Sequence, residues 1–389
     1  MVRSARIAIV GAGLAGLYAA YRLHQQGMRD YVLLEARAAP GGRIVSAAAH
    51  DADRGERFDL GPTWFWPDIQ PRLDRLIREL GLEAFAQFET GEMLVERAGG
   101  EPPLRVPGYV NAPPSMRLAG GMAALAGALR DRLPGAQVIT GQTVRRLRRA
   151  GGHVELDCED SAGKAHSWRA GHVLLAVPPR LADNSIAFAP PLPPDLSRQW
   201  RATPTWMAPH AKYVAVYGAP FWRRLGLSGE ARSSRGPMAE IHDASMPDAG
   251  AALFGFLGVP ARVRRGLDEA TLRAHCRAQL ARLFGPEAAR PRAEFLKDWA
   301  FERYTAAPAD LDSMQEHAAA PAATADSGPW AGRLTGIASE WSRQFPGYLA
   351  GAIEAAGSGA QAVLEALPPQ DAPMPDEGDT PAASSRSVP

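Results

Sequence analysis

The sequence predicts an α/β fold in which a domain of alternating strands and helices is interrupted by a sheet-rich insertion. Residues 7–34 read as a strand, a glycine turn, a helix and a second strand. Residues 211–257 instead read as successive antiparallel strands, and residues 334–367 return to a strand followed by a long helix. Because a βαβ-type beginning is completed by a strand and a helix near the end, we expect the first domain to be discontinuous.

Three glycines at fixed positions define the first turn. The turn spans residues 11–16 (GAGLAG) and follows the apolar run 7–10. Gly11 makes the tight turn, Gly13 lets the backbone approach a pyrophosphate, and Gly16 lets the next helix close on the strand. The first N–H groups of that helix, helped by the helix dipole, would then face the phosphates. The segment predicts a Rossmann-like dinucleotide site.

An acidic residue completes this pattern. Glu35 ends the second strand, 22 positions after Gly13, where a carboxylate can accept hydrogen bonds from ribose hydroxyls. The alternative for this segment is a signal peptide, because Arg3 and Arg6 precede an apolar stretch. That alternative fits less well, since glycines at fingerprint spacing interrupt the stretch and the chain continues directly into a strand.

The composition is that of an ordinary globular protein. The 389 residues are 46% hydrophobic and 22% charged, with a net charge of +1. This balance indicates neither nucleic acid nor a membrane surface as a partner, and no apolar run is long enough to span a bilayer. Cys158 and Cys276 are the two cysteines, without neighbours at metal-ligand spacing. We therefore expect a cytoplasmic protein with no metal site.

Helices and short strands are predicted between the first unit and the insertion. Amphipathic periodicity favours helices at 69–80 and 120–133, and the Gly- and Pro-rich stretch 85–118 is expected to be irregular. The segments before and after the turn at 160–163 predict a hairpin. Strands are expected at 137–140, 144–147, 153–158, 165–169 and 173–177. The last of these is apolar throughout, which is typical of a buried parallel strand.

The second half of the chain contains the insertion and the return. Strands are predicted at 211–217, 237–242, 251–257 and 293–298, a helix at 267–284, and the returning strand and helix at 334–338 and 347–367. The final stretch is rich in Pro, Ala and Ser without an aromatic residue, so a disordered tail is expected. The domain limits we expect are 1–76, 118–198 and 302–367 for the nucleotide-binding domain, 77–117 and 199–301 for a substrate-binding domain, and 368–389 for the tail.

Several motifs in a fixed order resemble the flavin amine oxidase family, which includes monoamine and polyamine oxidases. They are residues 11–16 (GAGLAG), 34–43 (LEARAAPGGR), 59–61 (DLG), 173–179 (VLLAVPP), 220–223 (PFWR), 298–299 (DW) with Tyr304, 339–340 (SE) and 346–353 (PGYLAGAI). The resemblance implies an FAD enzyme with two intertwined domains. The alternative for the whole set is another branch of the same superfamily, such as carotenoid desaturases.

The resemblance also implies which residues hold the FAD. They are Gly11, Gly13, Ala15, Gly16, Glu35, Ala36, Arg37, Gly42, Arg43, Gly61, Pro62, Thr63, Val144, Trp299, Tyr304, Ser339, Glu340, Tyr348 and Leu349. Among them, Glu35 matches the ribose acid, Arg37 and Arg43 the phosphate contacts, and Val144 the backbone that holds adenine. The helix that starts near Gly347 would aim its N-terminus at the flavin.

Four residues are expected at the reacting side. Lys212 matches the lysine that holds a water against flavin N5, where burial would lower the pKa of its amine. Trp299 matches the tryptophan beside the flavin, and Tyr348 one wall of an aromatic cage that guides the amine. We also expect Trp64 in the pocket, with Phe65 and Trp66 in the core. The competing interpretations are a solvated strand-end lysine and core packing of the aromatic residues.

Three departures from the family pattern affect the expected substrate. Pro308 stands where flavin-linked members carry a cysteine, so the FAD should be non-covalent. Ala309 stands where the second cage tyrosine belongs, so Trp64 or another aromatic residue would have to complete the cage. Trp64 also replaces the arginine with which amino-acid oxidases clamp a carboxylate. This favours an amine without an α-carboxylate, although Arg72 or Arg235 could reach the pocket. The segment between Trp64 and Gly120 is short for the family, which implies a more open site that accepts a larger substrate.

The expected reaction is oxidation of a small-molecule amine by hydride transfer to flavin N5. The resulting imine would hydrolyse to a carbonyl product, and O2 would be reduced to H2O2. The alternative is a flavin-dependent desaturase, dehydrogenase or tailoring oxidase of a secondary metabolite. A third hypothesis is an FAD-holding protein with an inactive site. The sequence leaves the oligomeric state open, a homodimer included.

Overall fold

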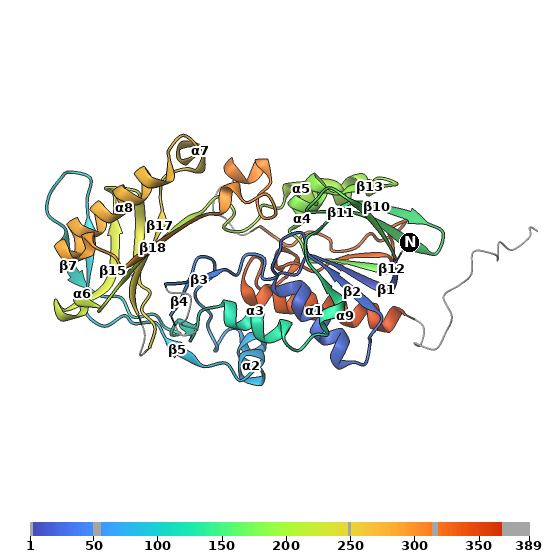
Figure 1. Ribbon diagram of the computed structural model, residues 1–389, viewed down its shortest axis with the longest axis horizontal. Helices are drawn as coiled ribbons and strands as arrows, with labels where there is room; N and C mark the ends of the chain where they lie inside the picture. The colour runs from blue at the N-terminus through green and yellow to red at the C-terminus, as the bar shows by residue number, and fades with distance from the viewer. Residues whose placement is uncertain (1–2, 50–55, 248–249, 313–317, 368–389) are drawn as a thin grey trace, which may run out of the picture.

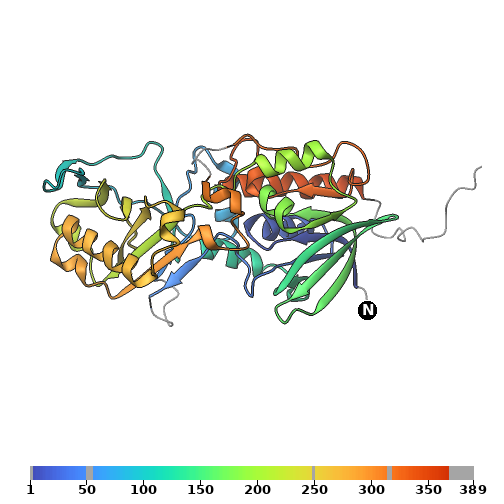
Figure 2. The same ribbon diagram turned by 90° about the horizontal axis from the view of Figure 1, so that it is seen from above.

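The computed structural model describes residues 3–49, 56–247, 250–312 and 318–367. These residues form two lobes, each with its own β-sheet, arranged along the long axis of the molecule (Figure 1). Seen from above, the same two lobes lie side by side and the chain crosses between them (Figure 2). The mixed α/β architecture with a Rossmann-like first lobe confirms the predicted fold class.

The first lobe contains an eight-stranded sheet within the described residues, in the order β13-β10-β11-β12-β1-β2-β9 with β19 also paired to β12. The interior strand β1 runs parallel to β2, as the glycine pattern predicts, and also parallel to β12. The strands are β1 (Arg3–Val10), β2 (Tyr31–Leu34), β9 (Val138–Ile139), β10 (Gln142–Ala150), β11 (His153–Asp160), β12 (Ala165–Leu175), β13 (Ala187–Ala189) and β19 (Leu334–Gly336).

Side chains of β1 alternate between two cores, as period-two geometry requires. Ile7 and Ile9 pack on the face covered by α1 (Leu14–Gln25) and α9 (Leu349–Ala366), whereas Ala8 and Val10 pack on the opposite face. Helix α1 packs closely against the end of β1 because the third residue of the helix is Gly16. A Cβ on Gly16 would lie 1.9 Å from the carbonyl oxygen of Gly11, so only glycine allows this packing.

The second lobe contains a seven-stranded sheet within the described residues, in the order β18-β14-β17-β16-β15-β6-β7. The predicted strands are confirmed, and β14 pairs antiparallel with both β17 and β18. Helix α8 (Glu269–Phe284) packs on one face through an apolar cluster. The strands are β6 (Glu92–Glu96), β7 (Leu104–Pro107), β14 (Ala211–Tyr217), β15 (Leu227–Ser233), β16 (Met238–Asp243), β17 (Ala251–Leu257) and β18 (Ala293–Asp298).

The remaining elements connect the lobes or cover their sheets. The helices are α2 (Pro71–Glu79), α3 (Ala123–Arg130), α4 (Pro179–Ser185), α5 (Pro194–Ala202), α6 (Phe221–Arg224) and α7 (Ala261–Arg264). Two short strand pairs join β3 (Ser46–Ala48) to β4 (Arg57–Asp59) and β5 (Ala84–Ala86) to β8 (Met116–Leu118). None of the helices in the described ranges combines the length and apolarity that a membrane crossing requires.

Two expectations about secondary structure were wrong. The stretch 85–118 is not irregular, because β6 pairs with β15 far along the chain and β7 pairs with β6. Its glycines and prolines lie between strands rather than replacing them. The segments 165–169 and 173–177 are not separate strands either, since β12 runs continuously and pairs with β11 at one end and β1 along its length.

The division into domains stays a prediction. Strands of the second sheet occur only between residues 92–107 and 211–298 in the described part of the chain, and the strands of the first sheet lie outside these stretches. The tail expected at 368–389 lies outside the described residues.

Candidate active site

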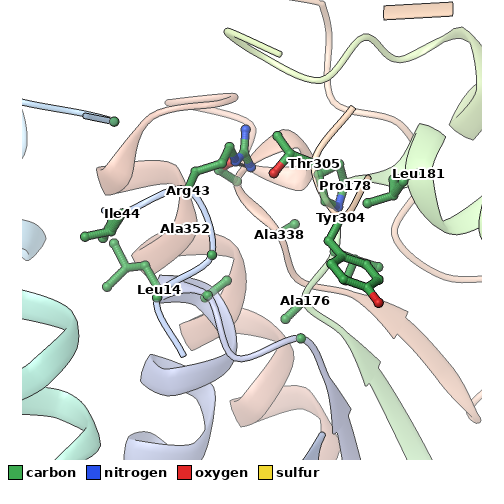
Figure 3. A pocket seen from close by; sticks show the side chains of 18 of the residues that line it. Leu14, Arg43, Ile44, Ala176, Pro178, Leu181, Tyr304, Thr305, Ala338 and Ala352 are labelled. Carbon is green, nitrogen blue, oxygen red and sulfur yellow. Dashed lines mark hydrogen bonds between the residues drawn. The ribbon is translucent and has the colours of Figure 1, made fainter. Parts of the chain in front are cut away.

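A cavity of about 730 Å³ is lined by residues of both lobes. Figure 3 shows part of its wall, where Arg43 and Thr305 lie near Pro178, Tyr304 and Leu181. The structure brings most of the predicted site residues together here, namely Gly11, Gly13, Ala15, Glu35, Ala36, Arg37, Gly42, Arg43, Gly61, Pro62, Thr63, Trp64, Val144, Lys212, Trp299, Tyr304, Ser339, Tyr348 and Leu349. Gly16 and Glu340 are not part of the lining, and each lies directly behind a lining residue.

Bare backbone forms one wall of the cavity. Gly11 adopts a φ of +99°, a conformation that glycine adopts readily. A Cβ on Gly42 would lie 2.9 Å from the Cα of Gly13, so these two segments touch without side chains between them. Gly13 is also the N-cap of α1, and no side chain caps the helix there. The free N–H groups and the positive end of the helix dipole make this wall suitable for a pyrophosphate.

Glu35 is held rigidly at the end of β2. Its side-chain oxygens accept hydrogen bonds from the backbone N–H of Ala12 (2.7 Å) and of Arg37 (2.8 Å). The residue is only 3% exposed, yet it lines the cavity. The Arg37 guanidinium lies 5.4 Å from the ring centre of Tyr304, which in turn shares a hydrogen bond with Thr143. This group presents a fixed carboxylate, suited to ribose hydroxyls, beside a cation.

Arg43 is fixed by an ion pair behind the cavity wall. Its Nη1 lies 2.6 Å from Oε1 of Glu340, and its Nη2 donates to Ser339. Burial alone would raise the pKa of Glu340, but the adjacent Arg43 guanidinium, together with hydrogen bonds from Ser339 and the backbone, outweighs burial and lowers the pKa. The carboxylate therefore stays charged and holds Arg43, whose guanidinium faces the cavity and could meet a phosphate.

Lys212 enters the cavity from β14 of the second lobe. Its side chain is 2% exposed, and Nζ donates hydrogen bonds to the carbonyl oxygen of Gly61 (3.2 Å) and to Thr63 Oγ1. Nζ also lies 4.0 Å from the ring centre of Phe254. Burial lowers the pKa of Lys212 to about 7, with Asp59 opposing and Arg117 adding to the effect. The competing interpretation as a solvated strand-end lysine is wrong.

Trp299 lies beside this lysine. Its Nε1 donates to the carbonyl oxygen of Leu60 at 2.9 Å, and the ring passes within 3.6 Å of where a Cβ on Gly61 would be. It begins a short 3₁₀ helix (Trp299–Phe301) directly after β18. The hydrogen bond fixes the indole against the Gly61 turn, so both line the same part of the cavity.

Aromatic rings surround Tyr348. The Trp66 ring lies 6.2 Å from the Tyr348 ring at 80°, and the Trp206 ring lies 6.3 Å away at 33°. The expectation that Trp66 packs in the core was wrong, although its neighbour Phe65 is fully buried. Trp64 lines the cavity too, and its Nε1 donates to Gln87 Oε1 at 2.8 Å.

Sequence reasoning missed several lining residues, Trp206 and Met207 foremost. Met207 is the non-glycine residue with a positive φ (61°) in the described chain, a strained conformation at the cavity wall. The arginines considered for a carboxylate clamp do not line the cavity within the described residues. Arg72 is exposed on α2, and Arg235 pairs with Glu96 in the second lobe.

The two cysteines lie outside this site. Cys158 on β11 and Cys276 on α8 are both buried and neither lines the cavity. Since the sequence contains no other cysteine, no thiol is available for a thioether to a bound group.

Comparison with known proteins agrees with this geometry. Residues 92–364 match the family described as flavin containing amine oxidoreductase, and residues 9–80 match the NAD(P)-binding Rossmann-like domain. A Dictyostelium discoideum protein described as probable flavin-containing monoamine oxidase A is 26% identical, over 90% of this chain and 95% of its own. Putrescine oxidase of Kocuria rosea is 25% identical, over 80% of this chain and 86% of its own. A solved structure of putrescine oxidase bound to putrescine has a TM-score of 0.74 at 20% identity, covering 94% of this chain and 100% of that one.

Proposed function

Because the chain belongs to the family of flavin-containing amine oxidoreductases, we propose that it oxidises a monoamine without an α-carboxylate and passes the electrons to O2, giving H2O2. Its cofactor is FAD, held without a covalent bond. When bound, FAD would supply the redox chemistry by accepting a hydride from the carbon beside the amine nitrogen, and water would hydrolyse the resulting imine of the substrate.

The cavity fits this cofactor. In our proposal, the backbone at Gly11 and Gly13 and the N-terminus of α1 bind the diphosphate, and the fixed guanidinium of Arg43 adds a cation. Glu35 accepts hydrogen bonds from the ribose. A second helix N-terminus would face the flavin end of the cofactor. Helix α9 begins at Leu349 without a side-chain cap, and its first turn lines the cavity.

The buried amine of Lys212 carries the proposal. It lies among the Gly61 turn, Trp299 and Phe254, and its hydrogen bonds leave it at the cavity wall. An amine with a pKa near 7 can carry or release a proton at physiological pH. Lys212 can therefore orient a water or hold positive charge where electrons pass to O2. The aromatic walls exclude bulk water and orient the substrate, which must be neutral to give up a hydride.

The lining residues indicate the substrate class. Glu35 is the one carboxylate among the described lining residues, and it lies with Arg37 and Tyr304 rather than with Lys212. A second ammonium group at the aromatic end would have no carboxylate partner among the described lining residues. The arginine next to Trp206 is Arg43, which already pairs with Glu340 and is assigned here to the diphosphate rather than to a substrate carboxylate. The rings of Trp66, Trp206 and Tyr348 instead suit an apolar or aromatic substrate body.

Two matched substrate pairs test this proposal. Phenethylamine and L-phenylalanine differ by one carboxylate, and butylamine and putrescine differ by one amine. We expect anaerobic bleaching of the yellow protein by phenethylamine and butylamine, with H2O2 formed when air is admitted, and at least tenfold slower bleaching by the other member of each pair. Bleaching without peroxide would favour the alternative of a different electron acceptor. No bleaching by any amine would contradict the proposed function.

A further inference from the structure

Asp59 is a buried carboxylate two residues before the Gly61 turn. It ends β4 and is 4% exposed. Its Oδ1 accepts hydrogen bonds from Ser46 Oγ (2.6 Å) and from the backbone N–H of Met122 (2.7 Å). Its Oδ2 is shielded from solvent and has no hydrogen-bond partner among the described residues. A carboxylate in such surroundings is costly unless a nearby cation compensates for it.

Two buried cations are close enough to interact with this carboxylate. Lys212 on β14 donates from Nζ to the carbonyl oxygen of Gly61, two residues after Asp59. Burial raises the pKa of Asp59, and the charge of Lys212 opposes this rise. Arg117 on β8 is 1% exposed and donates to the carbonyl oxygens of Ala244 (2.8 Å) and Ser245 (2.9 Å). Its Nε has no partner among the described residues, so part of its donor capacity is unused inside the protein. The three groups form a buried charge cluster behind the cavity wall.

The other charged groups around Lys212 have partners of their own. Lys297 lies opposite Lys212 on β18, but its Nζ pairs with Glu302 at 2.7 Å. On β16, Glu240 pairs with His242 at 2.6 Å. The residue opposite Lys212 on β17 is Phe256, and His210 lies just before β14 with its ring 6.5 Å from that phenyl ring. Among the described residues, Asp59 is therefore the carboxylate that acts on Lys212.

We propose that Asp59 is a positioning residue that keeps Lys212 in its cationic form, with Arg117 acting against it. This inference rests on the role proposed above for Lys212. Electron transfer to O2 develops negative charge, and an ammonium held at the cavity wall stabilises it. Asp59 provides the opposing charge that lets an ammonium exist in a site where burial disfavours it. The balance of Asp59 and Arg117 then sets the pH range over which the enzyme reoxidises quickly.

The two charges must act on Lys212 in opposite directions. Burial lowers the pKa of Lys212 most; Asp59 opposes this lowering and Arg117 adds to it. Asp59→Asn keeps the size of the side chain and an oxygen acceptor for Ser46 and Met122, but removes the negative charge. Arg117→Gln removes the positive charge. The first variant should weaken proton binding at Lys212 and the second should strengthen it.

Lysine-selective labelling can measure this directly in the holoenzyme. The sequence contains three lysines, Lys164, Lys212 and Lys297, so ¹³C-labelled lysine gives three Cε signals, and Lys212→Met identifies one of them. We expect the titration midpoint of Lys212 to fall by one pH unit or more in Asp59→Asn and to rise in Arg117→Gln. The matched control is Ser46→Ala, which removes a hydrogen bond to Asp59 but no charge and should move the midpoint much less.

A kinetic measurement separates this inference from the proposed function. Stopped-flow reoxidation of the reduced enzyme by O2 should show the same midpoint shift in Asp59→Asn, with anaerobic bleaching by amine unchanged. An unchanged Lys212 midpoint in Asp59→Asn would overturn the inference whether or not any amine is oxidised. If that variant does not fold, an unchanged or lowered midpoint in Arg117→Gln overturns it equally. If the Lys212 midpoint shifts in Asp59→Asn but no amine bleaches the protein, the inference about the charge cluster is supported and the proposed function is contradicted.

Discussion

Replacing Lys212 with methionine should change how the stability of the protein depends on pH. The amine has a pKa of 10.5 when exposed and about 7 when buried in the folded chain. Between these values the unfolded chain binds a proton that the folded chain does not, so the free energy of unfolding rises with pH. The stabilising contribution is complete above the unfolded value and is lost as the pH falls toward 7. Methionine fills a similar volume without a charge and abolishes this dependence.

The size of the effect follows from the same pKa values. Each pH unit above the folded pKa adds about 1.4 kcal/mol, so the stability of the wild-type protein relative to Lys212→Met should rise by about 3 kcal/mol between pH 6 and pH 9. Below pH 7 both folded and unfolded wild-type chains are protonated and the difference levels off. The slope of this stability difference against pH therefore measures the burial of the Lys212 amine and does not depend on the total stability of the protein.

Urea denaturation followed by tryptophan fluorescence can measure this difference at pH 6, 7.5 and 9, without FAD and with FAD in excess. The matched control is Lys164→Met, because Lys164 is exposed in the turn between β11 and β12 and should have little effect at any pH. A difference between wild type and Lys212→Met that stays constant within about 1 kcal/mol over this range would refute the reasoning. It would mean that water reaches the amine in the folded protein.

Three further predictions concern the cofactor and the substrate. Glu35→Gln should weaken FAD binding tenfold or more, because hydrogen bonds to a charged group contribute roughly 1.5–3 kcal/mol; fluorescence titration of the protein with FAD measures this, and an unchanged Kd would remove Glu35 from the site. Trp206→Ala should raise the KM for phenethylamine about tenfold, because the loss of an aromatic contact costs roughly 1.5 kcal/mol, with a smaller change for butylamine; equal effects on both substrates would speak against a ring contact. In wild-type enzyme, kcat/KM for phenethylamine should rise about tenfold per pH unit while most of the substrate is protonated, and a flat profile from pH 6 to 9 would show that the neutral amine is not the form that reacts.

The local part of the fold could be predicted from the sequence nearly residue by residue. Strand β1, helix α1, strand β2 and Glu35 lie as the glycine pattern predicts, because each feature depends on neighbours within one βαβ unit. Strand β15 was missed and β12 was divided in two, since their limits are set by partner strands distant in sequence. Propensity along a single segment does not contain that information.

Prediction of the candidate site was limited in the same way, because some of its residues meet only through tertiary packing. Trp64 and Trp66 lie on the same side of an extended segment whose middle residue, Phe65, points into the core. Period-two alternation was a usable signal for Trp66, and it was not applied to this segment. Trp206 had no such signal, because its place beside Tyr348 results from the packing of the segment just before α9 against the connection between the lobes. Residues brought together by tertiary packing alone need the structure.

The ion pair between Arg43 and Glu340 also makes hydrogen bonds to the main chain of Trp206. Arg43 Nη1 donates to the carbonyl oxygen of Trp206 at 3.3 Å, and Glu340 Oε1 accepts from its N–H at 3.4 Å. Both hydrogen bonds reach main-chain atoms, so any amino acid except proline can keep them at this position. The indole can thus be exchanged to reshape the substrate end while the anchor for the coenzyme stays intact, which makes position 206 a natural first choice for a mutant library aimed at new amines.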